Sequence, residues 1–271
     1  MILERIVIDL FLNKTKIKMD INVSLLPSGG YGYNFPSVKI QPLNFLEICQ
    51  YLDNVPEDDP LGKYLFDLRM MQDDDPNIKD CYVMDVDFLI FFKKLCTISE
   101  DLTYTIEVKC PHCGKSLKKT ISFEKDVHFK RIDSKIMNGA RIELGGHKYD
   151  TIVPTVSDFM KVFNIYLRYR KIDDLKMIKT IALIKDFDLQ GNQVEKDILE
   201  ATHSDITLLM ALRDLYYDRL EPIELFCPDC NEGKAPEERR SVAVSIDSLI
   251  VDFFRELYIN SPVDGSKILF K

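Results

Sequence analysis

The pattern of hydrophobic and polar positions changes its period along the chain, and each change marks a different predicted element. Residues 2–12 and 15–26 alternate apolar and polar side chains and are rich in β-branched residues, with a short polar break between them. An alternation of this kind indicates strands that bury one face. We therefore predict an N-terminal β-hairpin arm over residues 1–40, followed by a core over residues 41–271.

Apolar residues three and four positions apart predict most of the later elements to be helical. Helices are expected from about Pro42 to Asp53 and over residues 61–71, 86–98, 156–170, 172–185, 204–218 and 247–259. Ser157 and Ser204 precede acidic residues and are predicted helix caps. Strands are expected over residues 103–109, 117–124, 141–153, 221–226 and 240–246. Helices mixed with short β-hairpins place the chain in the α+β class.

Three kinds of connecting segment complete the pattern. Residues 27–36, PSGGYGYNFP, favour a turn, although Tyr31 and Tyr33 also suit an exposed contact patch. The acidic segments 56–60 and 73–77 are predicted to be solvated connections. DFDLQG, which begins at Asp186, starts like a calcium loop but lacks the later ligands, so a turn is expected there.

Two CPxC sequences carry the most specific chemical signal in the chain. Cys110 and Cys113 lie between two predicted strands, and Cys227 and Cys230 repeat this plan more than a hundred residues later. A CxxC turn presents two thiolates to one ion, and Gly114 permits the left-handed conformation that such turns favour. Four thiolates select zinc or iron and leave no position open for a substrate. We predict a structural zinc site on these four cysteines, which staples two hairpins together.

Other interpretations of the cysteines were weighed against this one. Two unrelated surface turns with free thiols would need no metal, and a redox-active CxxC would be expected to open a helix after a central strand, which neither pair does. Cys49, Cys81 and Cys96 have no partner at ligand spacing, and Cys49 and Cys96 fit apolar helix faces. His112, inside the first turn, is expected to be exposed and not to bind the metal.

The composition and the absence of catalytic motifs argue against several classes of function. The formal net charge is −8, which argues against general binding to nucleic acid or to an anionic membrane surface. The first residues lack the basic segment and cleavage site of a signal peptide, so a reducing cytoplasm is expected, where seven cysteines favour metal or free thiols over disulfides. No GxSxG, HExxH or P-loop sequence occurs. We therefore predict no catalytic residue, no cofactor-binding residue and no enzymatic activity.

One local feature favours nucleic acid. Seven basic residues cluster around the first cysteine pair: Lys109, Lys115, Lys118, Lys119, Lys125, Lys130 and Arg131. Glu124 and Asp126 are the acidic residues between them in the sequence. A zinc-ribbon regulatory protein that binds nucleic acid is the alternative that this patch supports, although the same patch suits an acidic protein surface.

Several segments resemble one protein family. The sequence MDVDFLIFFKKLCTISEDLTYTIEVKCPHC (84–113) resembles the baseplate hub assembly proteins of T-even-type phages, which carry an apolar helix, a short connection and a strand that leads into cysteines. VPTVSDFMKVF (153–163) and SVAVSIDSLIVDFFREL (241–257) are similar to later parts of that family. The N-terminal 40 residues and the acidic segments are not covered by the likeness.

The resemblance implies a role as a component or assembly factor of a contractile phage tail baseplate. Its partners would be other baseplate and tail proteins, with no membrane partner. Its location would be the host cytoplasm during assembly and then the virion tail. The candidate contact surfaces are the N-terminal hairpin, the Tyr31–Tyr33 loop and the basic face near Lys118 and Lys119.

Overall fold

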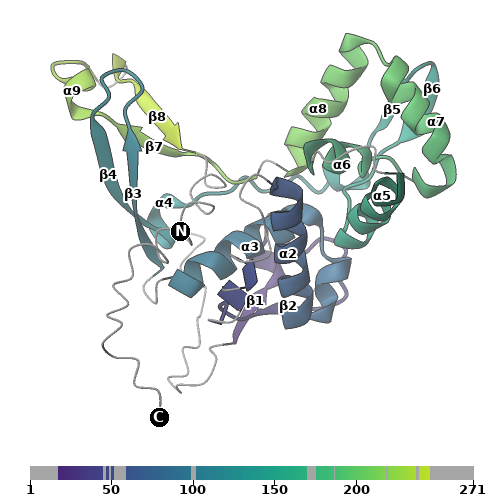
Figure 1. Ribbon diagram of the computed structural model, residues 1–271, viewed down its shortest axis with the longest axis horizontal. Helices are drawn as coiled ribbons and strands as arrows, with labels where there is room; N and C mark the ends of the chain where they lie inside the picture. The colour runs from purple at the N-terminus through teal and green to yellow at the C-terminus, as the bar shows by residue number, and fades with distance from the viewer. Residues whose placement is uncertain are drawn as a thin grey trace.

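The computed structural model combines helices with small antiparallel hairpins, in agreement with the predicted α+β class. Among the described residues, each named strand pairs within a two-stranded sheet. Figure 1 shows an arm of two hairpins and a helical lobe on opposite sides of a central body. The structure describes residues 18–44, 47–48, 50–51, 59–98, 102–169, 175–185, 187–217, 219–235 and 238–244.

The chain contributes to these three parts in an interleaved order. The central body comprises β1 (Met19–Asn22), η2 (Val23–Leu25), β2 (Ser37–Ile40), α2 (Pro60–Asp74), η3 (Pro76–Asp80) and α3 (Val83–Ile98). The cysteine arm comprises β3 (Thr103–Lys109), β4 (Ser116–Ser122), α4 (Phe123–Asp126), β7 (Ile223–Phe226), α9 (Pro228–Asn231) and β8 (Ser241–Val244). The helical lobe, preceded by η4 (Ile136–Asn138), comprises β5 (Arg141–Leu144), β6 (His147–Asp150), α5 (Val156–Tyr169), α6 (Leu175–Ile181), α7 (Phe187–Glu200) and α8 (His203–Tyr217). The chain therefore enters the arm twice, before and after the lobe.

The first described strand pairs with residues that follow the tyrosine loop. β1 runs antiparallel to β2, which places Met19 opposite Ile40. The strand that was predicted to pair with this region, residues 2–12, lies outside the described residues. Val38 and Ile40 are buried in the same core as α2 and α3. The described residues 18–40 thus contribute to the core of the central body.

The two long helices of the central body supply most of its core. α2 begins at Pro60, where the Asp59 carboxylate accepts a hydrogen bond from the Gly62 N–H at 2.8 Å. Proline suits this first position because its missing N–H would have no partner in the helix. Four of the apolar side chains that α2 buries recur every three or four residues: Leu61, Tyr64, Leu68 and Met71.

α3 is buried around most of its circumference, as its apolar sequence predicted, but it also buries two lysines. Lys93 pairs with Asp74 at 2.6 Å, and Lys94 pairs with Asp67, so both ammonium groups reach carboxylates of α2. Buried charges require partners of this kind. Within the described part of the chain, no helix has both the length and the apolar character needed to cross a membrane.

The acidic segment 73–77 is not the solvated connection that was predicted. Asp75 is 4 % exposed and accepts a hydrogen bond from the Lys39 N–H at 2.8 Å. Asp74 accepts from the Gln41 N–H at 2.9 Å. These carboxylates hold β2 against the end of α2, and Asp74 also pairs with Lys93, so both are bonded to groups of the protein.

The tyrosine loop is a turn, as predicted, but its two tyrosines have different environments. Tyr31 is 42 % exposed, whereas Tyr33 is half-buried. The Tyr33 hydroxyl donates a hydrogen bond to Asp85 at 2.6 Å and accepts one from the Tyr82 N–H at 2.8 Å. Tyr33 therefore anchors the loop to α3 and is not part of an exposed contact patch.

The helical lobe contains one helix that the sequence pattern did not predict. The turn expected at residues 186–191 is instead the beginning of α7. Asp197 on this helix is buried and accepts hydrogen bonds from the Tyr149 hydroxyl and from Gln193 at 2.7 Å. A carboxylate at a core-facing position interrupts the apolar period, which explains why α7 was missed.

Two helices of the lobe begin with the same reciprocal cap. Thr155 precedes α5, and its N–H and hydroxyl both donate to the Asp158 carboxylate, at 3.1 and 2.8 Å. Thr202 and Asp205 repeat this arrangement before α8. The serines that were predicted as caps lie two positions inside each helix. The threonines cap because an acidic residue three positions later can reach back to their N–H groups.

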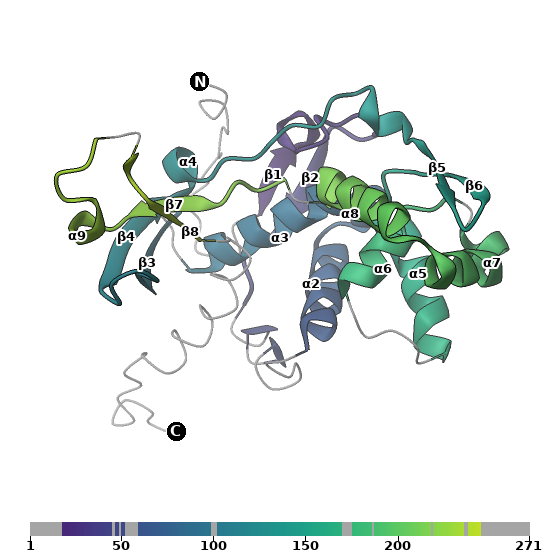
Figure 2. The ribbon, with the colours of Figure 1, turned by 90° about the horizontal axis from the view of Figure 1, so that it is seen from above.

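The two connections between the arm and the rest of the molecule run beside each other. The Lys130 N–H donates to the Arg219 carbonyl at 2.8 Å, and the Glu221 N–H donates to the His128 carbonyl at 2.8 Å. Figure 2 shows both connections crossing from the arm towards the lobe above α3. The base of the arm is therefore closed by backbone hydrogen bonds.

Candidate metal centre

Two short hairpins lie side by side in the cysteine arm (Figures 1 and 2). β3 pairs with β4 in one hairpin, and β7 pairs with β8 in the other. Alternate residues of these strands are buried and join one core: Ile106, Leu117, Ile121, Ile223, Leu225 and Val244. The alternation that predicted the strands thus also gives each hairpin an apolar face, which positions the cysteine turns at the ends of β3 and β7.

The first cysteine pair lies in a tight turn between β3 and β4. Cys110 is buried and Cys113 is exposed. The Gly114 N–H donates to the Cys110 carbonyl at 2.8 Å, and the Cys110 N–H donates to the Lys115 carbonyl at 2.8 Å. Gly114 has a φ of +73°, a conformation that residues with a Cβ rarely adopt. The predicted role of this glycine is confirmed.

The second pair uses a different local structure. Cys227 directly follows β7 and caps the N-terminus of α9, a single helical turn that begins at Pro228 and contains Cys230. The buried Asn231 side chain holds this turn in place. Its amide nitrogen donates to the carbonyls of Cys227 and Arg240, at 2.9 and 3.0 Å, and its oxygen accepts from the Arg240 N–H at 2.7 Å.

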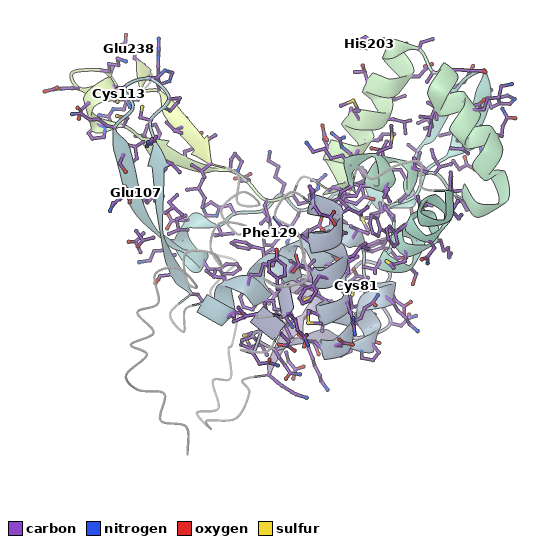
Figure 3. The ribbon with its side chains drawn as sticks, in the orientation of Figure 1. Cys81, Glu107, Cys113, Phe129, His203 and Glu238 are labelled. Carbon is purple, nitrogen blue, oxygen red and sulfur yellow. The ribbon has the colours of Figure 1, made fainter. Side chains whose placement is uncertain are left out.

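The fold brings the two pairs together at the tip of the arm, where Figure 3 labels Cys113. The four Sγ atoms all lie within 4.8 Å of one another. The Cys110 and Cys230 sulfurs are 3.8 Å apart, and the Cys113 and Cys227 sulfurs are 3.6 Å apart. Four thiolates at about 2.3 Å from a zinc ion would have sulfur–sulfur edges of about 3.8 Å. The four cysteines are therefore spaced as a metal site requires.

The surroundings of the sulfurs favour a cation between them. The backbone N–H groups of His112 and Cys113 point at the Cys110 sulfur and lower the pKa of this thiol from 9.0 to about 7. The pKa of Cys230 is raised to about 12, first by Cys113 and then by burial and the other two sulfurs. Crowded thiols resist losing several protons together, and a bound cation removes that resistance. The donor set fits a tetrahedral soft-ligand metal such as zinc or iron.

The remaining cysteines and histidines lie elsewhere. Cys81 is buried in the central body (Figure 3), and Cys96 is half-buried on α3. Cys49 lies outside the described residues. His112 is exposed on the first cysteine turn, as predicted. Among the described residues, the four cysteines of the arm are the one group that could hold a metal ion.

The basic cluster around the first cysteine pair is partly neutralised, in two of three cases by residues that the sequence analysis had not placed beside it. Three of its seven members form ion pairs: Lys115 with Asp229, Lys118 with Glu107 at 2.9 Å, and Lys119 with Asp126 at 2.7 Å. Glu107 comes from the neighbouring strand, and Asp229 comes from the second cysteine turn. The Arg131 guanidinium also donates to the Ser24 carbonyl at 2.9 Å. The local positive charge is therefore smaller than the sequence indicated.

Two supporting groups of the site were missed by the sequence analysis. Asn231 fixes the second cysteine turn, and the Lys115–Asp229 ion pair joins the two turns directly. The sequence did contain a signal for this ion pair, because Lys115 follows the first CPxC turn and Asp229 lies within the second. The role of Asn231 depends on its hydrogen bonds to Arg240, the residue before β8, which a single sequence does not display.

Comparisons with known proteins add no family to this picture. The chain matches no protein-family model, no curated protein and no solved structure.

Proposed function

We propose that the chain is a non-enzymatic component or assembly factor of a contractile phage tail baseplate, in which Cys110, Cys113, Cys227 and Cys230 hold one structural zinc ion. The observation that carries the metal assignment is the four-sulfur cluster, with its spacing and its polar support. A tetrahedral ion with four thiolate ligands has no position for a substrate, so its role is to hold structure. The baseplate assignment rests on the resemblance of residues 84–113 and the later segments.

The arm offers a surface for partner proteins. Phe226 is 51 % exposed on β7, where it occupies a solvent-facing position of the regular alternation between buried and exposed residues. Exposed aromatic side chains are enriched at protein interfaces. The zinc-ribbon alternative, binding to nucleic acid, is supported less well, because ion pairs offset part of the basic cluster on which it depends.

Metal content tests the first half of the proposal. Elemental analysis of the purified protein should find one zinc per chain, and a Cys230→Ser variant should lose it. Cys96→Ser is the matched control, because this half-buried thiol lies outside the arm and its loss should leave the zinc content unchanged. Protein that is folded but contains neither zinc nor iron contradicts the assignment, and stoichiometric iron would replace zinc by another soft-ligand metal.

Phage genetics tests the second half. Disruption of the gene in its phage should give particles that lack tails or carry incomplete baseplates. Baseplate complexes from infected cells should bind the wild-type protein and bind a Phe226→Ser variant less well. Normal infectious tails in the absence of the gene would overturn the baseplate role while leaving the metal assignment intact. Submicromolar, sequence-dependent DNA or RNA binding at physiological salt would establish the alternative.

A further inference from the structure

The four sulfurs of the candidate metal centre differ in how easily a molecule from solvent can reach them. Cys110 and Cys227 are each 1 % exposed, and Cys230 is half-buried. Cys113 is exposed at the tip of the arm (Figure 3). Oxidation of a thiolate depends on its exposure, so an oxidant should meet the Cys113 sulfur first. A structural metal needs no exposed ligand, and the exposure of this one therefore requires its own explanation.

A sulfur of the other cysteine turn lies beside the exposed one. The distance between the Cys113 and Cys227 sulfurs is 3.6 Å, whereas the second contact across the turns, between Cys110 and Cys230, measures 3.8 Å. A disulfide bond is about 2.05 Å long, so a bond between Cys113 and Cys227 needs the two atoms to approach by about 1.5 Å. The exposed sulfur thus has a partner on the other hairpin within a short movement.

Contacts other than the metal ligands hold the two cysteine turns near each other. The Lys115 ammonium of the first turn pairs with the Asp229 carboxylate of the second. The Asn231 amide donates to the Cys227 carbonyl at 2.9 Å and fixes the second turn. The ion pair is exposed and therefore weak, so the apolar core that the two hairpins share supplies most of this support. The sulfurs of Cys113 and Cys227 should consequently stay close together when the ion leaves.

We propose that Cys113 is a site of oxidation by hydrogen peroxide, and that the product is a Cys113–Cys227 disulfide that replaces the metal as the link between the hairpins. The replacement of the metal rests on the proposed zinc site. The choice of the two cysteines rests on the exposure of Cys113 and on its distance from the Cys227 sulfur.

The reaction has two steps, in which the two sulfurs together lose two electrons and the peroxide gains them. The Cys113 thiolate attacks the peroxide, an S–O bond forms, the O–O bond breaks, and the departing hydroxide takes a proton from solvent to form water. The Cys227 thiolate then attacks the Cys113 sulfur of this sulfenic acid. The S–S bond forms, the S–O bond breaks, and the second hydroxide also leaves as water.

This reaction would change what holds the arm without separating its hairpins. Only thiolates bind the ion, and the two that remain cannot complete a tetrahedral site, so the metal should leave. The new bond joins the same two turns that the metal joined. A reducing cytoplasm keeps thiols reduced and favours the metal, whereas a virion outside the cell meets oxidising surroundings. In the proposed baseplate, the disulfide would keep the arm ordered there.

Stepwise addition of hydrogen peroxide to the full, metal-loaded chain tests the inference through two measurements. A chromogenic chelator follows zinc release, and mass spectrometry of peptides from the unreduced protein identifies each disulfide. One zinc ion should leave for every two thiols lost, and the first disulfide should join Cys113 to Cys227. Cys96→Ser is the matched control, because this half-buried thiol lies outside the arm and its loss should change neither measurement.

Hydrogen exchange distinguishes a new link from simple loss of the metal. Peroxide-treated protein should keep its protection in residues 105–125 and 222–245 after the zinc has left, whereas chelated, reduced protein should lose it. Equal exchange in the two samples overturns the proposal, and so does a first disulfide within one turn or to Cys230. Protein that contains no metal before treatment contradicts the zinc assignment itself. Zinc-loaded protein with a different first disulfide contradicts this inference alone.

Discussion

Replacing Asp85 by asparagine should change how the stability of the central body depends on pH. Asp85 lies near the start of α3 and has no exposed surface. Its carboxylate accepts hydrogen bonds from the Ser28 N–H at 2.8 Å, from the Ser28 hydroxyl at 2.5 Å and from the Tyr33 hydroxyl at 2.6 Å. These bonds lower its pKa, but burial raises it more, and the result is a pKa of about 6 instead of 3.8.

The sign and size of the effect follow from this pKa. The folded protein binds a proton at Asp85 near pH 6, whereas the unfolded chain does so only near 3.8. The stabilisation from this group is therefore fully present below pH 3.8 and is lost as the pH rises through 6. Linkage between these two values gives about 1.4 kcal/mol more free energy of unfolding at about pH 5 than at about pH 7.5.

Urea unfolding of the wild type and of Asp85→Asn at both pH values measures this contribution. The asparagine variant also alters hydrogen bonds to Ser28 and Tyr33, but that change is the same at both pH values and cancels in the comparison. Other carboxylates and the cysteine site cancel as well, because both proteins contain them. Of the groups that face Asp85, the thiol of Cys81 has a pKa of about 12, and burial also raises the pKa of Tyr33 and Tyr82, so all three keep their protons.

Asp87, the remaining acidic neighbour of Asp85, is ion-paired with Lys179. Asp80→Asn is the matched control, since Asp80 is exposed, and it should leave the pH dependence unchanged. The reasoning is refuted if the wild type and Asp85→Asn show the same pH dependence, or if the wild type gains stability towards higher pH relative to the variant. The first result would mean that the three hydrogen bonds balance burial, and the second would mean that they outweigh it.

Three further changes test other parts of the fold. Asn231→Ala should weaken zinc binding about 10- to 100-fold in a chelator competition, because it removes the hydrogen bonds that hold the second cysteine turn, and an unchanged affinity would contradict this role. Gly139→Ala should lower the melting temperature strongly, since its Cβ would lie 1.9 Å from the Thr151 carbonyl oxygen. Gly146→Ala has open space around it and should cost only about 1–2 kcal/mol of backbone strain. Equal effects of the two changes would show that the chain relaxes around position 139. Asp75→Ala should lower the free energy of unfolding by about 1–3 kcal/mol by leaving two partly buried N–H groups unpaired, and an effect no larger than that of the exposed Asp73→Ala would contradict the observed burial of Asp75.

The elements of the arm could be predicted because their signals are local. The strand predicted over residues 103–109 has the same bounds as β3, and the second strand differs from β4 by one or two residues at each end. Alternation of side chains and the CxxC turns each depend on a few adjacent residues. The same signals placed the four cysteines in one group, because two like hairpins can bury their apolar faces against each other.

The central body and α7 were harder to predict because their polar groups pair across the fold. A sequence pattern assigns lysines and carboxylates to solvent, yet Lys93 and Lys94 are buried on α3 and Asp75 is buried beside β2. Each of these charges has its partner on an element that is distant in sequence. The same reason hid α7, where Asp197 occupies a position that an amphipathic helix would give to an apolar residue.

The backbone hydrogen bonds at the base of the arm reduce the length of the loop that a metal ion at its tip would close. Cys113 and Cys227 lie 114 positions apart, and a metal would seem to close a loop of that length. The paired connections at Lys130 and Arg219 already close most of it and leave about a quarter of the length for the metal to close. Each halving of loop length reduces the closure cost by about 0.6 kcal/mol, so the backbone pairing lowers it by about 1 kcal/mol.

Metal removal should therefore loosen the arm and leave the rest of the fold in place. We expect faster hydrogen exchange first in residues 105–125 and 222–245, with protection in α3 and α5 retained. Equal loss of protection in the helical lobe would show that the metal holds the whole chain together, and unchanged exchange in the arm would show that its two hairpins need no metal. A local effect suits a protein that presents the arm to a partner, because the ion would then order the contact surface on a body that folds without it.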